Sequence, residues 1–466
     1  MINTAPFVKT LKDKPIAVFG LGLSGMATAR ALVAAKARVV AWDDSEETRL
    51  KAEREGIPVF DFVFGGMEGY GALIPAPGVP LHYPEPHKAI VQARGHAVEV
   101  MGDLEILHRC DHGKKTIGIT GTNGKSTTTA LIHHILKETG FDSVLGGNIG
   151  KPVLDLSMPK FNGVFVLEMS SYQIDLCPTF HPDISVHMNV TPDHLDRHGT
   201  MEEYAASKAR IFEGPGVAVC GVDDDYSAAM MDKVVKAGLR KAIPVSVKKE
   251  IVGGIYIKDG HLIDHIGEKP ADAGPINDIP TLPGLHNAQN ICAAYAACRS
   301  MGIEADEILK HTRSFAGLQH RQFLSRIING VSYINDSKAT NAEATSKALV
   351  CYHNIYLIAG GRPKTGGLNG LEQYVDRIRH VFLLGEAMDD FADWCAKMGV
   401  PHTKSFSLDV AVLEAHQLAQ SERGQPGGAG CVLLSPACAS WDQFKNFEHR
   451  GDVFMSLVNS LSEDTN

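Results

Sequence analysis

Residues 117–127 read Ile-Gly-Ile-Thr-Gly-Thr-Asn-Gly-Lys-Ser-Thr, a short apolar strand that runs into a glycine-rich turn and then a helix. This arrangement wraps backbone N–H groups around a phosphate at a helix N-terminus, whose dipole favours anions. Gly121 and Gly124 let the backbone approach the anion closely. Lys125 supplies a positive charge for the outer phosphates of a nucleotide, and Ser126 offers a hydroxyl to Mg²⁺. The stretch therefore predicts that the chain binds ATP.

The spacing of this turn departs from the usual phosphate loop. That loop has a glycine five residues before its second glycine, where this chain has Ile119, so Gly121 makes a shorter loop. The alternative is a tight strand-to-helix turn that binds nothing. Such a turn has no need of Lys-Ser-Thr at 125–127, which favours the phosphate loop.

Length and composition are those of a multidomain globular protein. At ~100 to 200 residues per domain, 466 residues predict about three domains. A formal charge of −9 provides no basic surface for nucleic acid or anionic lipid. The first 18 residues hold no signal-like apolar run, and no uncharged apolar run reaches the ~20 residues of a membrane span, so we expect a cytoplasmic protein without membrane insertion. Nine cysteines without a Cys-x-x-Cys pair indicate reduced thiols.

The first hundred residues contain a second glycine turn. An apolar strand at 15–19 is followed by Gly-Leu-Gly-Leu-Ser-Gly at 20–25, an alanine-rich helix to Ala37, and a strand at 38–42 that ends in Asp43. A βαβ unit with a G-x-G-x-x-G turn and an acid after its second strand is the fingerprint of dinucleotide binding. The same geometry serves any ligand that carries a pyrophosphate. A Rossmann-type oxidoreductase is therefore one alternative for this chain.

Polar side chains follow the predicted strands of the middle region. A buried strand at 163–167 is followed by Glu168, and a strand at 184–190 is followed by His194. Ligands of open α/β sheets bind at the carboxyl ends of the strands, so both side chains are expected beside the phosphate loop. The next helix is expected to begin with a capping box of Thr200 and Glu203. The Pro- and Gly-rich stretch 270–283 is expected to be a surface loop.

The last third of the chain repeats this pattern. Strands at 332–335, 355–359 and 431–434 are each followed by a polar segment, at 336–341, 360–364 and 435–440. Three apolar strands with polar residues at their carboxyl ends predict another parallel-sheet binding edge.

Taken together, these segments resemble the Mur ligase superfamily of ATP-dependent peptide-bond-forming enzymes, over essentially the whole chain. The motifs that carry the resemblance lie at 121–127, 167–173, 189–197, 282–287, 320–321, 335–341 and 435–451. The last of them, Ser-Pro-Ala-Cys-Ala-Ser-Trp-Asp-Gln-Phe-Lys-Asn-Phe-Glu-His-Arg-Gly, points to the member that adds D-glutamate. The resemblance implies an α/β protein of three domains: a Rossmann-like UDP-substrate domain (1–104), a central P-loop ATPase-like domain (105–317) and a Rossmann-like C-terminal domain that binds the amino acid and closes on ATP (318–466).

The resemblance also implies an activity. Such an enzyme phosphorylates the terminal carboxylate of UDP-N-acetylmuramoyl-L-alanine with ATP, and the amine of D-glutamate then attacks the acyl phosphate, in peptidoglycan precursor synthesis. Both partners are small molecules, and the enzyme is expected to be a monomer. Another amide ligase of the superfamily, similar to MurE or to folylpolyglutamate synthase, is the alternative within it. Outside the superfamily, the rivals are the oxidoreductase and a non-catalytic phosphate-loop switch.

Five residues match the family's catalytic and metal positions. The resemblance implies that Lys125 holds the outer phosphates, and that Ser126 and Glu168 hold a first Mg²⁺. It implies that His194 and Lys208 hold a second one, with Lys208 carrying CO₂ as a carbamate. Chemistry alone favours other roles for the last two. Mg²⁺ prefers oxygen ligands, which favours a structural histidine, and a helical lysine usually lies on a solvated face.

The remaining binding residues are carried over position by position. For ATP they are Gly121, Thr122, Asn123, Gly124, Lys125, Ser126, Thr127, Asn287, Asn290, Arg321, Asp336 and Lys338. The UDP substrate matches Leu23, Ser24, Asp43, Asp44, Ser45, Gly78 and Asn148. The D-glutamate pocket matches Thr340, Lys364, Ser440 and Phe447. An alternative for Asp336 is a surface ion pair, and for the two asparagines the ordering of a turn. Two residues depart from the family pattern near the glutamate pocket, Arg362 and Trp441.

Overall fold

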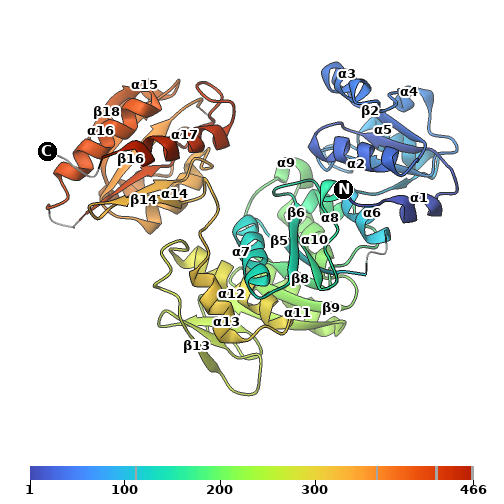
Figure 1. The fold of residues 1–466 in the computed structure, drawn as a ribbon, viewed down its shortest axis with the longest axis horizontal. Helices are drawn as coiled ribbons and strands as arrows, with labels where there is room; N and C mark the ends of the chain where they lie inside the picture. The colour runs from blue at the N-terminus through green and yellow to red at the C-terminus, as the bar shows by residue number, and fades with distance from the viewer. Residues whose placement is uncertain (111–112, 364–365, 426–428, 463–466) are drawn as a thin grey trace. The chain divides into compact units, whose positions relative to one another are not determined.

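The structure is a computed structural model that describes residues 1–110, 113–363, 366–425 and 429–462. The described residues form three β-sheets, each covered by helices (Figure 1). The chain divides into two compact units, one of residues 1–278 and 285–314 and the other of residues 279–284 and 315–466. The predicted α/β class is confirmed.

The first sheet is parallel and has the order β2-β1-β3-β4. Its central strands β1 and β3 are buried along their whole length, which explains why they read as unbroken apolar runs. The strands are β1 (Ile16–Phe19), β2 (Val39–Trp42), β3 (Ala72–Pro75) and β4 (Glu99–Val100); the helices are α1 (Ala5–Thr10), α2 (Leu23–Ala34), α3 (Glu46–Arg54), α4 (Phe62–Gly65), α5 (Lys88–Gly95) and α6 (Asp103–Arg109).

The second sheet has the order β13-β12-β11-β10-β9-β8-β5-β7-β6. Strand β5 lies between β7 and β8 in parallel register, so the turn that follows β5 is flanked by the segments that follow its two neighbours. The strands are β5 (Lys115–Thr120), β6 (Asp142–Gly147), β7 (Gly163–Glu168), β8 (Ile184–His187), β9 (Gly216–Gly221), β10 (Arg240–Ser246), β11 (Ile255–Lys258), β12 (His261–Asp264) and β13 (Ala271–Pro275).

The polar segments at the carboxyl edge of this sheet lead into helices. Helix α7 begins at the end of the glycine-rich turn and contacts α12. The helices are α7 (Lys125–Glu138), η1 (Val153–Asp155), α8 (Ser171–Asp175), α9 (Leu195–His198), α10 (Met201–Ala209), η2 (Arg210–Phe212), α11 (Asp225–Ala237), α12 (Leu285–Ser300) and α13 (Ala305–Arg313).

The expected surface loop at 270–283 is partly wrong. Ala271–Pro275 forms β13, the edge strand of the second sheet, antiparallel to β12. None of its residues is buried, and it contains both glycine and proline. An edge strand of this kind has no alternating apolar residues, which is why the sequence pattern did not distinguish it from a loop.

The first two sheets belong to one compact unit because they share a hydrophobic core. A single buried cluster contains Ile16 and Leu32 of the first sheet's layer together with Leu154 and Phe165 of the second. Polar contacts add to it: the guanidinium of Arg30 lies 3.0 Å from a carboxylate oxygen of Asp155. The domain division at 104/105 stays a prediction.

The third sheet lies in the second unit and has the order β14-β15-β19-β16-β17-β18, parallel except for the β14–β15 pair. Alternate residues of its central strands enter two different apolar clusters, because side chains alternate between the faces of a sheet. The strands are β14 (Phe323–Ile328), β15 (Val331–Asn335), β16 (Ile355–Gly360), β17 (Ile378–Leu384), β18 (His402–Phe406) and β19 (Cys431–Leu434); the helices are α14 (Ala342–Cys351), η3 (Glu372–Arg377), α15 (Met388–Met398), α16 (Leu408–Ser421) and α17 (Phe447–Ser460).

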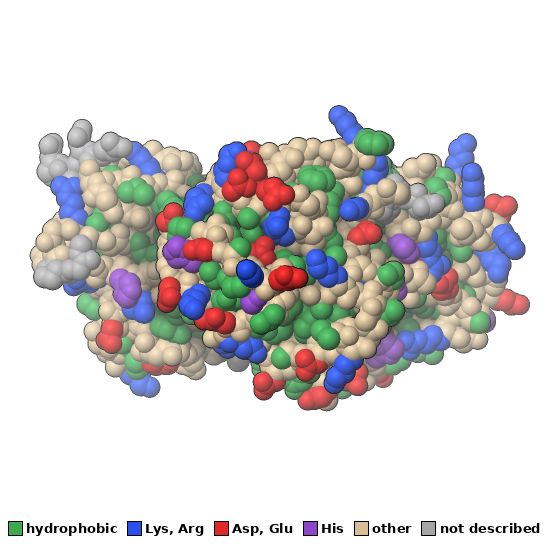
Figure 2. Space-filling view, turned by 90° about the horizontal axis from the view of Figure 1, so that it is seen from below, with side chains coloured by type: hydrophobic (Ala, Val, Ile, Leu, Met, Phe, Trp, Pro, Cys, Tyr) green, Lys and Arg blue, Asp and Glu red, His purple; other side chains and the backbone are tan. Residues whose placement is uncertain are grey.

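The expected reduced thiols agree with the structure. All nine cysteines are free thiols, and eight of them are buried, as expected of small apolar side chains. Figure 2 shows lysine, arginine, aspartate and glutamate side chains interspersed on the face it presents, without a basic stripe. Among the described residues, no helix combines the length and the apolar character needed to cross a membrane.

Candidate functional site

The turn after β5 requires glycine at two positions. Gly121 and Gly124 have φ of +142° and +85°, a region that side chains disfavour. A Cβ atom on Gly121 would lie 2.7 Å from the Cβ of Met188, and one on Gly124 would lie 2.2 Å from Oδ1 of Asn290. The glycines therefore allow the close approach of the turn to β8 and α12.

The segment that follows β8 holds the turn in place. The N–H of Thr122 donates to the carbonyl of Asn189 at 2.8 Å, and the N–H of Asn123 donates to the side-chain oxygen of Asn189 at 2.9 Å. The N–H of Thr191 donates to the hydroxyl of Thr122 at 3.0 Å. The backbone of the turn is thus ordered by protein contacts, and a phosphate would meet a preorganised loop.

Two lysine amines converge on one carbonyl of this turn. The Nζ of Lys125 donates to the carbonyls of Gly121 and Thr122, at 2.9 and 2.8 Å, and the Nζ of Lys208 donates to the same Gly121 carbonyl at 2.9 Å. Two ammonium groups beside a single acceptor would repel each other, which disfavours a charge on both amines at once.

Lys208 is only 1 % exposed, which excludes the solvated helix face. It lies on α10, whose first turn is capped by the hydroxyl of Thr200 accepting from the N–H of Glu203 at 3.2 Å. Burial, and then the nearby charge of Lys125, hold the pKa of Lys208 well below its usual range. Its amine also lies 4.6 Å from the centre of the Tyr204 ring. A neutral amine is therefore favoured at this position.

Glu168 carries an unsatisfied buried oxygen. It ends β7 in register with Ile119 of β5, and it is 2 % exposed. Its Oε1 accepts from the side-chain amide of Asn148 at 2.8 Å, whereas its Oε2 has no hydrogen-bond partner. The hydroxyl of Thr120, at the end of β5, is also buried without a partner. Buried polar atoms of this kind are costly unless a ligand satisfies them, so the residues present fit a cation.

His194 lies in the segment after β8, with a left-handed backbone at φ +55°. Its side chain is 46 % exposed, its Nε2 lies 3.4 Å from the carboxylate of Asp193, and its ring lies 5.2 Å from that of Tyr172. Within the described ranges, no three His, Cys, Asp or Glu side chains are grouped to hold a metal ion. A metal at Glu168 and His194 would therefore need other ligands, such as a hydroxyl, a phosphate or a modified lysine.

The two asparagines of α12 form part of the same wall. The side-chain oxygen of Asn290 accepts from the hydroxyl of Thr128 at 3.3 Å, and its amide donates to Asn287 at 3.0 Å. Both are buried. Asn290 therefore ties α12 to α7, and a nucleotide contact for either asparagine stays a prediction.

The residues predicted for the UDP substrate gather, with one exception, at the carboxyl ends of the first sheet. One oxygen of Asp43 accepts from the N–H of Leu21 at 2.6 Å, and the other accepts from the N–H of Ser45 at 2.8 Å. Leu23 is 83 % exposed and Gly78 is exposed. The exception is Asn148, which follows β6 and bonds to Glu168.

Asp336 follows β15 in the second unit and is buried. Its two oxygens accept from the hydroxyl of Ser435 at 2.7 Å and from the N–H of Gln322 at 3.1 Å. Burial raises the pKa of Asp336 to about 7, although these hydrogen bonds oppose the shift. The burial argues against a simple surface ion pair.

Of the other predicted residues of this unit, Arg321, Lys338, Thr340 and Ser440 lie on loops, and Phe447 begins α17. The amine of Lys338 lies 4.4 Å from the centre of the Phe447 ring. Thr340 and Ser440 follow the carboxyl ends of β15 and β19, and Arg321 precedes β14. Lys364 lies outside the described residues. Of the two departures, Arg362 pairs with Glu386 at 3.1 Å and Trp441 is 66 % exposed.

Sequence reasoning missed Arg450, which ties these loops together. It is fully buried, and its guanidinium donates to the carbonyls of Ser337 at 2.8 Å and Cys438 at 3.1 Å. Burial lowers its pKa to about 10. The available signal was helical periodicity: Arg450 shares a face of α17 with the buried Phe454 and Val458, at i+4 and i+8.

Comparisons with known proteins agree with this architecture. Residues 119–298 match the model of the Mur ligase middle domain. The chain is 47% identical to the UDP-N-acetylmuramoylalanine--D-glutamate ligase of Rhizobium etli, over 97% of this chain and 96% of that protein. It is 43% identical to the ligase of the same name from Phenylobacterium zucineum, over 98% of each.

Solved structures with low sequence identity share the fold. UDP-N-acetylmuramate-alanine ligase MurC from Thermotoga maritima is 19% identical, with a TM-score of 0.57 over 96% of this chain and 99% of that one. A UDP-N-acetylmuramoyl-L-alanyl-D-glutamate--2,6-diaminopimelate ligase is 18% identical, with a TM-score of 0.56 over 96% of this chain and 92% of that one. From its full-length relatives, the chain belongs to the Mur ligase family, among the UDP-N-acetylmuramoylalanine--D-glutamate ligases.

Proposed function

We propose that this chain uses ATP to join D-glutamate to UDP-N-acetylmuramoyl-L-alanine through an acyl phosphate. The γ-phosphoryl group passes to the terminal carboxylate of the UDP substrate and ADP leaves. The amine of D-glutamate then attacks the acyl carbon, the amide bond forms and phosphate leaves. A free carboxylate is a poor electrophile, and phosphorylation supplies the missing leaving group. The names of the full-length relatives support the substrates.

The observation that carries this proposal is the convergence of Lys125 and Lys208 on the Gly121 carbonyl, beside a strand edge that ends in Glu168. The positive charge of Lys125 at a preorganised turn suits the β- and γ-phosphates. In this reading Lys125 exchanges its two carbonyl partners for phosphate oxygens when ATP binds. The rest of the nucleotide contacts are Gly121 to Thr127, Asn287 and Asn290 in the first unit and Arg321, Asp336 and Lys338 in the second.

Mg²⁺ fits the same edge. The unpartnered Oε2 of Glu168 supports a cation there, and Ser126, His194 and a carbamate on Lys208 would complete two sites. Bound there, Mg²⁺ would spread the charge of the γ-phosphoryl group in transfer. Glu168 is held for this role by the amide of Asn148.

The carbamate follows from the state of the Lys208 amine. A neutral amine adds to CO₂, forming an N–C bond and releasing a proton, and the product is an anion with two oxygens. The depressed pKa of Lys208 supports the neutral amine that this addition needs. An ammonium at this position would repel the metal, whereas a carbamate would bind it.

The two other substrates bind at the carboxyl ends of the first and third sheets. The UDP substrate binds Leu23, Ser24, Asp43, Asp44, Ser45, Gly78 and Asn148, and D-glutamate binds Thr340, Lys364, Ser440 and Phe447. Residues 1–104, 105–317 and 318–466 act as the UDP-substrate, ATP and amino-acid domains. The enzyme works as a monomer in the cytoplasm, where its nucleotide substrates are found.

A panel of free amino acids tests the reaction. Phosphate release from ATP is measured with UDP-N-acetylmuramoyl-L-alanine and each amino acid in turn, in buffer with Mg²⁺ and bicarbonate. D-glutamate alone should give release in step with a new amide product. Equal release without an amino acid, or a preference for diaminopimelate or L-glutamate, would overturn the assignment.

A further inference from the structure

Arg197 connects the first sheet to the segment that carries His194. It lies on the single turn of helix α9, and its N–H donates to the carbonyl of His194 at 3.0 Å. Its guanidinium reaches across to the turn after β3, where it donates to the carbonyl of Gly78 at 2.6 Å and to that of Val79 at 3.1 Å. A planar fork on two successive carbonyls fixes the orientation of both partners.

The same guanidinium rests on Tyr172, which touches His194. The centre of the Arg197 guanidinium lies 4.9 Å from the Tyr172 ring, and the Tyr172 ring meets the His194 ring edge to face at 5.2 Å. His198, the next residue of α9, stacks on Tyr172 at 5.4 Å and bonds through Nε2 to the hydroxyl of Ser171 at 2.9 Å. A displacement of Arg197 would therefore displace His194 as well, both through the backbone of α9 and through the ring of Tyr172.

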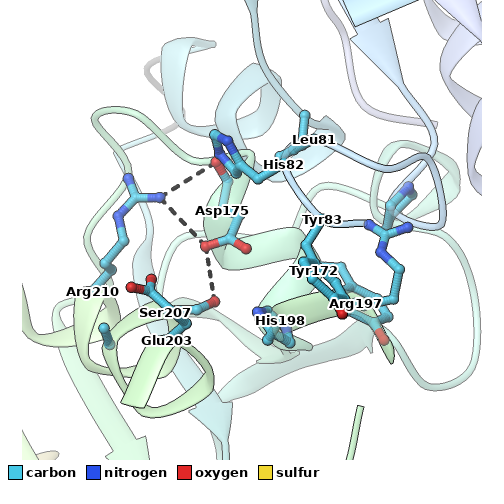
Figure 3. A pocket seen from close by; sticks show the side chains of 12 residues that line it. Leu81, His82, Tyr83, Tyr172, Asp175, Arg197, His198, Glu203, Ser207 and Arg210 are labelled. Carbon is cyan, nitrogen blue, oxygen red and sulfur yellow. Dashed lines mark hydrogen bonds and ion pairs between the residues drawn. The ribbon is translucent and has the colours of Figure 1, made fainter. Parts of the chain in front are cut away.

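The turn after β3 rests on α9 at a second point. Tyr83 lies against Gly199, where a Cβ atom would come within 3.4 Å of the Tyr83 ring. A cavity of about 380 Å³ lies beside this contact, with Arg197, Tyr172 and Tyr83 at one end and Arg210 at the other (Figure 3). The contact between the turn and α9 thus borders open space, where it can shift without displacing packed core.

We propose that Arg197 is a positioning residue that couples occupancy of the UDP-substrate turn at Gly78 to the placement of His194. This inference rests on the proposed function, in which Gly78 meets the UDP substrate and His194 meets the metal. Substrate that moves the Gly78 carbonyl moves the guanidinium, and with it Tyr172 and α9. The Nε of Arg197 is buried without a hydrogen-bond partner, so the guanidinium is held by the bonds of its two other nitrogens and by its contact with Tyr172.

Coupling of this kind is reciprocal, so it is measured from either site. Isothermal titration gives the Kd of UDP-N-acetylmuramoyl-L-alanine with and without Mg²⁺ plus a non-hydrolysable ATP analogue. We expect the wild-type Kd to tighten at least about fivefold when the metal and nucleotide are present. In Arg197→Lys, which keeps the charge but loses the fork, the ratio of the two Kd values should fall to about one.

Arg210→Lys is the matched control. Arg210 lines the same cavity, but the carbonyls it binds, those of Ile174, Asp175 and Cys177, all belong to the second sheet's segments. This variant should keep the wild-type ratio. Thermal unfolding of both variants separates coupling from stability, since a purely structural role for Arg197 would lower Tm and weaken both Kd values by one factor.

Three results would overturn the coupling. The ratio of the two Kd values could be one in the wild type, it could be unchanged from the wild type in Arg197→Lys, or it could fall as much in Arg210→Lys as in Arg197→Lys. Each of these leaves the proposed function standing if the protein binds the UDP substrate and ligates D-glutamate. Absence of any binding of the UDP substrate to the wild type would instead refute the proposed function.

Discussion

The chain contains two glycine turns with the same strand–turn–helix architecture and opposite chemistry. In the first, after β1, the N–H of Leu21 donates to a carboxylate oxygen of Asp43 at 2.6 Å. In the second, after β5, the amines of Lys125 and Lys208 donate to the carbonyl of Gly121, each at 2.9 Å. The first turn is therefore closed by a carboxylate and the second by amines.

This difference shows why a glycine pattern alone does not identify a ligand. A carboxylate that occupies a donor of the first turn suits the hydroxyl and N–H groups of a ribose or a base. The amine of Lys125 at the second turn suits the outer phosphates of ATP, as proposed above. Because the chain belongs to a family of ligases, the complete G-x-G-x-x-G pattern at 20–25 is no sign of an NAD-dependent enzyme.

Removal of the second turn's lysine should have the largest effect. We expect Lys125→Ala to reduce ligation by about 10³-fold or more, because in the proposed function its amine holds the outer phosphates of ATP. The Kd of the UDP substrate should change little, since that substrate belongs to the first turn. Steady-state phosphate release checks the loss of ligation, and titration calorimetry checks the Kd of the UDP substrate. Near-normal turnover would mean that the turn does not hold the phosphates.

Lys208→Ala should have the next largest effect, a loss of ligation activity of about 10²- to 10³-fold. Formate or acetate should raise the activity of Lys208→Ala about tenfold by occupying the position of the carbamate. The activity of Lys208→Arg should not rise with either carboxylate, because the charge and bulk of its side chain remain. Assays with added carboxylate and ¹³C NMR of the wild type in labelled bicarbonate provide the measurement. A fully active Lys208→Ala, or a wild type without a carbamate signal, would remove the carbamate from the mechanism.

A change in the first turn should have a smaller and selective effect. Asp43→Asn leaves an amide NH₂ facing one of two N–H donors, those of Leu21 and Ser45, so the turn loses a charge-assisted hydrogen bond. We expect the Kd of the UDP substrate to weaken about tenfold, with the KM for ATP unchanged. Fluorescence titration with NADH should show no binding to either protein. Micromolar NADH affinity would contradict the contrast between the two turns.

The smallest effect concerns the pH dependence of stability. The folded-state pKa of Lys208 is depressed, so the unfolded chain binds the extra proton and the free energy of unfolding rises with pH between that pKa and the usual value near 10.5. Its contribution to the slope is at most about 1.4 kcal/mol per pH unit. In CO₂-free urea titrations, the free energy of unfolding of Lys208→Met should exceed that of the wild type by the largest amount at the acidic end of this window. A difference in the free energy of unfolding that grows with pH would contradict the depressed pKa of Lys208.

Much of the site was predictable because its signals are local in sequence. The strand before Glu168, the glycines at 121 and 124 and the cap at Thr200 are patterns of a few residues, and the structure has them in place. The strand β13 was missed because an exposed edge carries no apolar period. Arg450 was missed because a buried arginine looks like a surface one until the carbonyls around it are known.

The sequence by itself determined the α/β class, the two glycine turns and the family, since each rests on residue types at short, fixed spacing. Only the tertiary structure decided the state of the groups in the site. Lys208 meets a carbonyl 87 positions earlier in the chain, and its burial, rather than its place on a helix, depresses its pKa. The unpartnered oxygen of Glu168 and the reach of Arg197 to Gly78 likewise depend on segments that only the packed fold brings together, because burial and electrostatic fields are properties of the surroundings and not of the residue.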